Sequence, residues 1–100
     1  ILSNEITEAW SGLSVKNYKN LKGLKKENLR DNMSNLELVL NMLAEATTTE
    51  ISKEKQPETF DENKIIAKQG GTVAGNARKE IEEKTGKKVV SKLSAKNLLD

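Results

Sequence analysis

Hydrophobic side chains recur at helical spacing over residues 34–53, where they lie three or four positions apart. Such a period of about 3.6 residues predicts a helix with one apolar face. The apolar stripe consists of Leu36, Val39, Leu40, Leu43, Ala46, Thr47 and Ile51. The opposite side carries Glu37, Asn41, Glu45 and Thr48. We therefore expect the apolar stripe to pack in the core, with Leu38 and Met42 beside it available for a second contact.

A second long helix is predicted over residues 59–84, with an apolar stripe of smaller side chains. This stripe consists of Ile66, Gly70, Val73, Ala74, Ala77 and Ile81. Ala67, Gly71 and Gly75 lie four positions apart and form a smooth shoulder beside it. Each glycine inside a helix costs roughly 1 kcal/mol relative to alanine, so a run of them needs a compensating role. We expect Gly71 and Gly75 to let the two long helices approach closely.

Two short helices are predicted before the first long one, over residues 1–10 and 14–23. Gly12 separates them. Ser14 is suited to cap the second, because its oxygen can accept a hydrogen bond from an N–H group at the helix start. Gly23 stands where a left-handed glycine commonly follows a helix, so the second helix is expected to end there.

Capping signals mark the long helices as well. Ser34 and Glu37 have the spacing of a capping box, in which each side chain bonds the backbone N–H of the other. Thr59 is suited to cap the second long helix, and Gly86 is suited to end it.

Two further elements are expected after Gly86. Residues 87–91 contain an adjacent pair of valines and are predicted to be extended, whereas residues 94–99 are predicted to form a short closing helix. The chain is therefore expected to be a single all-α domain over residues 1–100, a small bundle of four to five helices with two long helices packed together.

Cysteine and histidine are both absent from the chain. This excludes disulfides and thiolate chemistry, and it removes the commonest general base and metal ligand. The carboxylates of Glu80, Glu82 and Glu83 belong to a charged helix end, which is typical of a solvated surface rather than an acid–base pair. We therefore expect no enzyme activity, metal, cofactor or small-molecule substrate.

No apolar run approaches the ~20 residues that span a bilayer. Residues 1–20 also lack the apolar segment of a secretory signal. The chain is expected to be cytoplasmic and not to bind membranes. It begins at Ile1 rather than methionine, so we expect it to be a domain excised from a longer protein.

The run of glycines at positions 70, 71 and 75 also suggests a phosphate-binding loop as an alternative. Such a loop needs a glycine, four residues and then Gly-Lys-Ser/Thr after a strand, whereas this run lies in a helical pattern. Tight helix packing is the preferred interpretation, and approach of the backbone to a nucleic-acid phosphate is the alternative.

Basic residues cluster near both ends of the chain. Residues 14–30 contain six basic residues against Glu27 alone, and residues 84–96 contain five lysines and no acid. The candidates for contact with a nucleic-acid backbone are Lys16, Lys19, Lys22, Lys25, Lys26, Arg30, Lys87 and Lys88. Tyr18 and Trp10 are candidates for base stacking. The alternative is an ordinary solvated helix surface, with Trp10 in the core.

Two segments resemble the C-terminal region of the DNA-damage-inducible DinD proteins and the related BRO-type phage antirepressors. The first is WSGLSVKNYKNLKGLKKENLRDNM, residues 10–33, where GLKK, the Leu-x-Asp-x-Met of residues 29–33 and the following Glu37-Leu38 carry the similarity. The second is AKQGGTVAGNARKEIEEKTGKKVVS, residues 67–91, which resembles the closing segment of the family.

The resemblance implies a non-catalytic accessory domain of the DNA-damage response, acting on DNA or on DNA-bound recombinase filaments. The alternative is an oligomerisation module of a phage-type antirepressor or transcription regulator. The family's N-terminal BRO-type domain is expected to precede this segment in the full protein. Leu38, Met42 and the small-residue face favour a homodimer. The contrast between the basic ends and residues 37–62, which contain seven acidic residues against two lysines, favours it as well.

Overall fold

The computed structural model describes residues 2–92 of the chain. Every regular element in this range is helical, which confirms the predicted all-α fold with two long helices packed together. Residues 87–91, expected to be extended, form no strand. The helix predicted over residues 94–99 lies outside the described residues.

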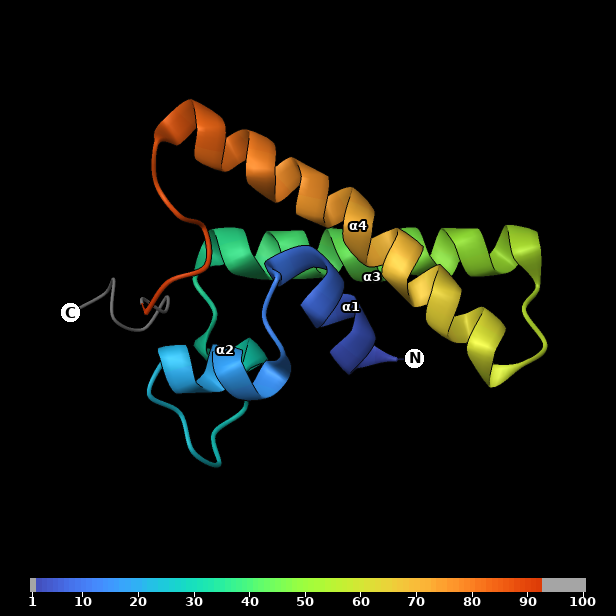
Figure 1. Ribbon diagram of the computed structural model, residues 1–100, viewed down its shortest axis with the longest axis horizontal. Helices are drawn as coiled ribbons and strands as arrows, with labels where there is room; N and C mark the ends of the chain where they lie inside the picture. Colours follow the sequence, from blue (N-terminus) through green and yellow to red (C-terminus); the bar gives the residue numbers. More distant parts are fainter. Residues whose placement is uncertain (1, 93–100) are drawn as a thin grey trace.

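Two long antiparallel helices, α3 (Asn35–Lys55) and α4 (Phe60–Thr85), form the frame of the molecule (Figure 1). The short helix α1 (Ser3–Ser11) packs against both of them. Helix α2 (Val15–Leu21) lies beside α1, on the side of the molecule where α3 begins. A single 3₁₀ turn, η1 (Arg30–Asn32), leads into α3.

Side-chain caps fix where three of the helices begin, as the sequence predicts. Ser34 Oγ accepts a hydrogen bond from the Glu37 backbone N–H over 3.4 Å, and Glu37 Oε1 accepts one from the Ser34 N–H over 2.9 Å. Ser14 Oγ accepts the Asn17 N–H at the start of α2, and Thr59 Oγ1 accepts the Glu62 N–H at the start of α4. Helix α4 ends at Gly86, whose φ of 71° is left-handed.

The glycines of α4 let its backbone approach two other helices. A Cβ added at Gly70 would lie 2.0 Å from Thr48 Oγ1 of α3. A Cβ at Gly71 would lie 2.4 Å from Ala9 Cβ of α1, and one at Gly75 would lie 3.0 Å from the Ala9 carbonyl oxygen. The prediction that Gly71 and Gly75 let the two long helices approach each other is therefore wrong. These two glycines allow the close approach of α1, and Gly70 allows that of α3. All three glycines are buried, so their backbone does not contact a nucleic-acid phosphate.

Helix α3 turns toward the core a face that combines Leu40 of the predicted stripe with Glu37, Asn41 and Thr48 of the predicted polar side. Its buried residues are Glu37, Leu40, Asn41, Ala44 and Thr48. Of the expected stripe, Leu36, Val39 and Leu43 are instead 40%, 59% and 38% exposed. The physical reason is the close approach of α4, because a small side chain such as Thr48 fits against a glycine and a leucine does not.

The buried polar groups of α3 find hydrogen-bond partners, which makes their burial tolerable. Trp10 Nε1 donates to Asn41 Oδ1 over 3.0 Å, and Thr48 Oγ1 donates to the Ala44 carbonyl over 2.8 Å. Within residues 2–92, no buried side-chain nitrogen or oxygen lacks a partner.

The two largest aromatic residues lie at the centre of the core. Trp10 and Tyr18 are both 0% exposed, and their rings meet edge to face with centroids 6.1 Å apart. Ile6 and Ala67 are buried with them. The prediction that Trp10 and Tyr18 stack on bases is therefore wrong, because neither ring reaches the surface.

Candidate nucleic-acid interface

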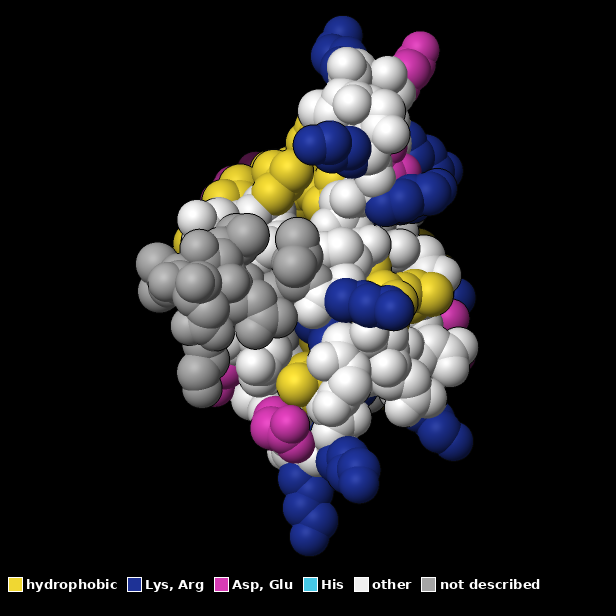
Figure 2. All heavy atoms as spheres, turned by 90° about the vertical axis from the view of Figure 1, so that its left-hand side faces the viewer, with side chains coloured by type: hydrophobic (Ala, Val, Ile, Leu, Met, Phe, Trp, Pro, Cys, Tyr) yellow, Lys and Arg dark blue, Asp and Glu magenta, His cyan; other side chains and the backbone are white. Residues whose placement is uncertain are grey.

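Basic side chains gather at the end of the molecule that carries α2 and the last turn of α4. Figure 2 shows Lys and Arg side chains from the top to the bottom of this face, with some Asp and Glu side chains among them. Six of the eight predicted cations form no ion pair within residues 2–92: Lys16, Lys19, Lys25, Lys26, Lys87 and Lys88. Lys19 is partly buried and the other five are exposed. We call these five exposed lysines the lysine face.

The other two predicted cations are engaged within the protein. The side chain of Lys22 is 1% exposed, and its Nζ lies 2.7 Å from Glu37 Oε1 and 2.8 Å from the Ser91 carbonyl oxygen. Lys22 therefore cannot reach a phosphate, and its prediction as a binding residue is wrong. Arg30 forms an ion pair with Glu45 over 2.7 Å, while about half of its side chain stays exposed.

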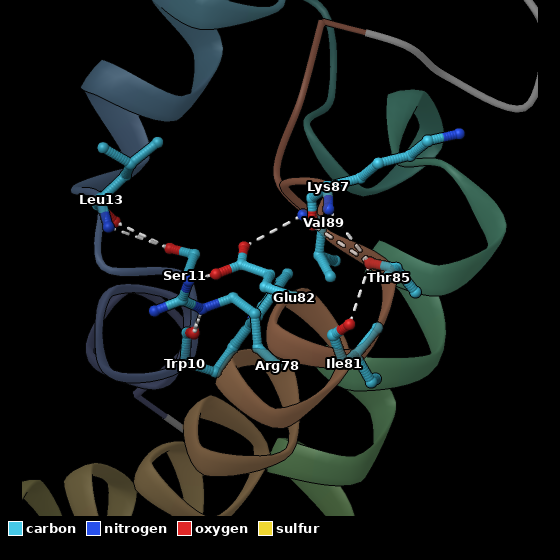
Figure 3. A network of polar contacts seen from close by, with 9 residues as sticks. All are labelled: Trp10, Ser11, Leu13, Arg78, Ile81, Glu82, Thr85, Lys87 and Val89. Atoms are coloured by element: carbon cyan, nitrogen blue, oxygen red, sulfur yellow. Dashed lines mark hydrogen bonds and ion pairs between the residues drawn. The ribbon is translucent and has the colours of Figure 1, made fainter.

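The segment after α4 is fixed to the helices by a polar network that Figure 3 shows. Arg78 Nε donates to the Trp10 carbonyl over 2.8 Å, and its Nη1 lies 2.9 Å from Glu82 Oε1. The second carboxylate oxygen of Glu82 accepts the Val89 backbone N–H over 3.0 Å. Val89 is also buried in the core, and the segment that carries Lys87 and Lys88 lies at the same end of the molecule as α2 (Figure 1).

Sequence reasoning missed Arg78 and Glu82 as the residues that position this segment. Their separation of four residues on a helix was the available signal, since such pairs commonly form ion pairs. Burial raises the pKa of Glu82, but the Val89 N–H and the Arg78 guanidinium outweigh it and hold this pKa below its usual value. The carboxylate therefore stays ionised and keeps its hold on Val89.

A second carboxylate organises the loop between α2 and η1. Glu27 Oε1 accepts the backbone N–H groups of Lys25 over 3.2 Å and of Lys26 over 3.1 Å. Hydrogen bonds from the backbone N–H groups of Glu27 itself, Lys25 and Lys26 lower the pKa of the Glu27 carboxyl. Glu27, the one acidic residue of the basic segment 14–30, therefore stabilises the turn that carries Lys25 and Lys26.

Beneath this face lies a buried polar cluster that joins α2 to α3. The Tyr18 hydroxyl donates to Glu37 Oε2, and Lys22 Nζ sits 5.7 Å from the centre of the Tyr18 ring. Burial raises the pKa of the Tyr18 phenol, and the hydrogen bond to the Glu37 carboxylate raises it further. Tyr18 therefore stays protonated well into the alkaline range.

We predict that the protein loses stability at alkaline pH because Tyr18 ionises more readily in the unfolded chain. Tyr18 is the only tyrosine of the chain, so tyrosinate absorbance reports its ionisation alone. In the unfolded chain its phenol ionises near pH ~10, whereas in the folded protein its pKa is higher. Above that pH the unfolded state binds fewer protons than the folded state, so the free energy of unfolding falls as pH rises. In an alkaline titration, tyrosinate absorbance should appear together with the loss of helical circular dichroism. A Tyr18→Phe variant should lack this component, and tyrosinate forming while the helices persist would contradict the prediction.

The described residues contain neither a metal-binding cluster nor a membrane-spanning helix. Within residues 2–92, no three acidic side chains are grouped so that they could hold a metal ion. In the same range, no helix combines the length and the apolar character needed to cross a bilayer.

Comparison of the chain with protein-family models, curated proteins and solved structures gave no match in any of the three.

Proposed function

We propose that this chain is a non-catalytic accessory domain of the DNA-damage response that acts on DNA or on DNA-bound recombinase filaments. The observation that carries the proposal is the lysine face. The α2 region and the segment after α4 are far apart in sequence but lie at the same end of the molecule (Figure 1), and their exposed lysines form no ion pair within residues 2–92. The resemblance of residues 10–33 and 67–91 to DinD proteins supports the same function.

The chemistry of the lysine face suits a phosphate backbone. Each lysine that neutralises a phosphate releases a condensed counterion, so several such contacts give an affinity that falls steeply with salt. Lys87 and Lys88 are held in place by the buried Val89 next to them. This anchoring reduces the conformational freedom that binding would otherwise remove.

We expect a Lys87→Gln/Lys88→Gln variant to bind DNA about tenfold more weakly at low salt, since two phosphate contacts are lost. The slope of log affinity against log salt concentration should fall by roughly 0.7–0.9 for each lost contact. Fluorescence anisotropy with a labelled oligonucleotide, repeated over a series of salt concentrations, measures both quantities.

The matched control is Lys53→Gln/Lys55→Gln, which removes the same charge from the last turn of α3, at the opposite end of the molecule (Figure 1). It should leave affinity and salt slope nearly unchanged. If wild-type protein binds neither single-stranded nor duplex DNA at low salt, direct contact with DNA is ruled out.

A second candidate function, an oligomerisation module of a phage-type antirepressor or transcription regulator, is favoured by apolar side chains exposed on the long helices. These are Leu36, Val39, Met42, Leu43, Phe60, Ile65 and Val73. Of the two residues expected to serve a second contact, Met42 is exposed and Leu38 packs against the core. A second copy of the chain would gain roughly 25 cal/mol per Å² of apolar surface that it buries there. Sedimentation equilibrium showing a monomer at high concentration would eliminate this candidate.

A further inference from the structure

A groove of about 300 Å³ lies between α1, α2, η1 and α3, and it is not part of the lysine face. Its walls include Thr7, Val15, Lys19, Leu29, Met33 and Asn41. A volume of this size is at the lower end of small-molecule sites, so the groove suits one compact group rather than a polymer segment.

Asn41 presents a fixed hydrogen-bond donor to this groove. The residue is 6% exposed, and its Oδ1 accepts a hydrogen bond from Trp10 Nε1 over 3.0 Å. Because the indole N–H can only donate, the amide must turn its oxygen to Trp10 and its Nδ2 away from it. Within residues 2–92, Nδ2 has no hydrogen-bond partner, and no buried polar atom is unsatisfied. The Nδ2 group must therefore reach open space, which the groove provides.

Thr7 supplies a second polar group to the same groove. The residue is 7% exposed, and its carbonyl accepts from Ser11 Oγ over 2.6 Å. Its own hydroxyl has no hydrogen-bond partner in the described part of the chain. By the same reasoning the Thr7 hydroxyl is open to a ligand.

The rest of the lining combines apolar surface with positive charge. Leu29 and Met33 are buried core residues, and Val15 packs against the same core. Lys19 forms no ion pair within residues 2–92. Arg30 adds a half-exposed guanidinium whose Glu45 partner also lines the groove.

We infer that this groove receives the base of one unpaired nucleotide of single-stranded nucleic acid. The apolar walls contact the faces of the base, Asn41 Nδ2 and the Thr7 hydroxyl donate to its carbonyl oxygens, and Lys19 binds the adjoining phosphate. In a duplex these base edges are paired and stacked, and extracting a base costs a few kcal/mol, so the groove favours single strands. The inference rests on the proposed function, because the lysine face holds the strand whose base enters the groove.

The test compares an oligothymidine with an abasic strand of the same length, at one low salt concentration and by fluorescence anisotropy. Thymine offers two carbonyl acceptors, whereas the abasic strand keeps the phosphates and lacks the bases. We expect wild-type protein to bind oligothymidine about tenfold more tightly than the abasic strand, as one well-contacted base contributes. Thr7→Val, which keeps the shape and removes the hydroxyl, should reduce this preference about threefold or more.

A second variant, Asn41→Asp, keeps an oxygen for Trp10 and replaces the donor with an acceptor, so it should also reduce the preference. Thermal melts followed by circular dichroism establish that each variant is folded, and Thr7→Val decides the result if Asn41→Asp does not fold. Equal binding of both strands by wild-type protein, or an unchanged preference in Thr7→Val, refutes base binding in the groove. Neither result would contradict phosphate binding by the lysine face. Absence of binding to either strand refutes the proposed DNA contact and the groove together. The Lys87→Gln/Lys88→Gln variant should weaken the binding of both strands by the same factor. This separates the contribution of the phosphate contacts from that of the base in the groove.

Discussion

Replacing Gly70 with alanine is expected to lower the free energy of unfolding by about 2 kcal/mol or more, although alanine is the better helix former. Alanine gains roughly 1 kcal/mol in helix propensity. Against this, its Cβ would lie 2.0 Å from Thr48 Oγ1, 2.7 Å from the Thr48 nitrogen and 2.8 Å from the Thr48 Cα. Because two of these atoms are backbone, the long helices must move apart, and overpacking of this kind costs about 1–3 kcal/mol or more. Urea unfolding followed by circular dichroism measures the change.

The control for this prediction is Gln69→Ala, an exposed neighbour on α4 that should change stability by less than about 0.5 kcal/mol. Adding Thr48→Ala to Gly70→Ala should recover part of the loss, since the hydroxyl clash disappears and the backbone clash remains. A Gly70→Ala protein at least as stable as wild type would show that the helices are not in close contact there.

The helices themselves could be predicted because their end signals are local. Ser34 with Glu37, and Thr59 with Gly86, needed only a few neighbouring residues to be recognised, and the structure places α3 and α4 within two residues of the predicted bounds. Side-chain capping depends on the backbone of the same turn, so it is largely independent of tertiary packing.

The inward face of α3 could not be predicted, because it depends on contacts between helices. The stripe around Val39 has the stronger hydrophobic pattern, but α4 brings a glycine against Thr48 and thereby selects the face with small side chains. Asn41 is buried because Trp10, far away in sequence, supplies its hydrogen bond. Hydrogen bonds of this kind, which make the burial of a polar side chain tolerable, can be recognised only in the three-dimensional structure.

The sequence nominates lysines for the candidate interface, but it does not show which of them are engaged inside the protein. Clusters of lysine in the sequence nominated Lys87 and Lys88, which are exposed and form no ion pair within residues 2–92. The same clusters could not show that Lys22 is withdrawn into the core. Position alone does not reveal this, because burial of a lysine requires an acid such as Glu37 at the right distance, and that acid comes from another helix.

Close packing of the helices connects the glycines to the proposed groove. Gly71 and Gly75 let α1 lie directly on α4, and a Cβ at Gly75 would also lie 3.3 Å from the Trp10 Cα. This approach places Trp10 where its indole N–H meets Asn41. The small residues of α4 thus affect the groove indirectly: they fix the position of Trp10, and Trp10 orients the amide of Asn41.

Glu37→Leu is expected to be among the most destabilising single substitutions in the chain, lowering the free energy of unfolding by about 3–5 kcal/mol. The Glu37 carboxylate is fully buried and accepts hydrogen bonds from Tyr18, Lys22 and Ser34. With leucine in its place, the buried ammonium group of Lys22 would lose the carboxylate oxygen that lies 2.7 Å from it. A domain of this size is stable by roughly 5–15 kcal/mol in total, so urea unfolding should show a much lower midpoint.

The double variant Lys22→Met/Glu37→Leu separates the charge from the other contacts of Glu37. It removes both members of the ion pair, so it should be more stable than Glu37→Leu, because the buried ammonium group is removed together with the carboxylate that it pairs with. It should still be less stable than wild type, since the Tyr18 hydroxyl and the Ser34 N–H lose their acceptor, at about 1–3 kcal/mol for each group left unsatisfied. If Glu37→Leu alone lies within about 1 kcal/mol of wild type, the ion pair with Lys22 does not stabilise the fold, and the cluster would not hold α2 against α3.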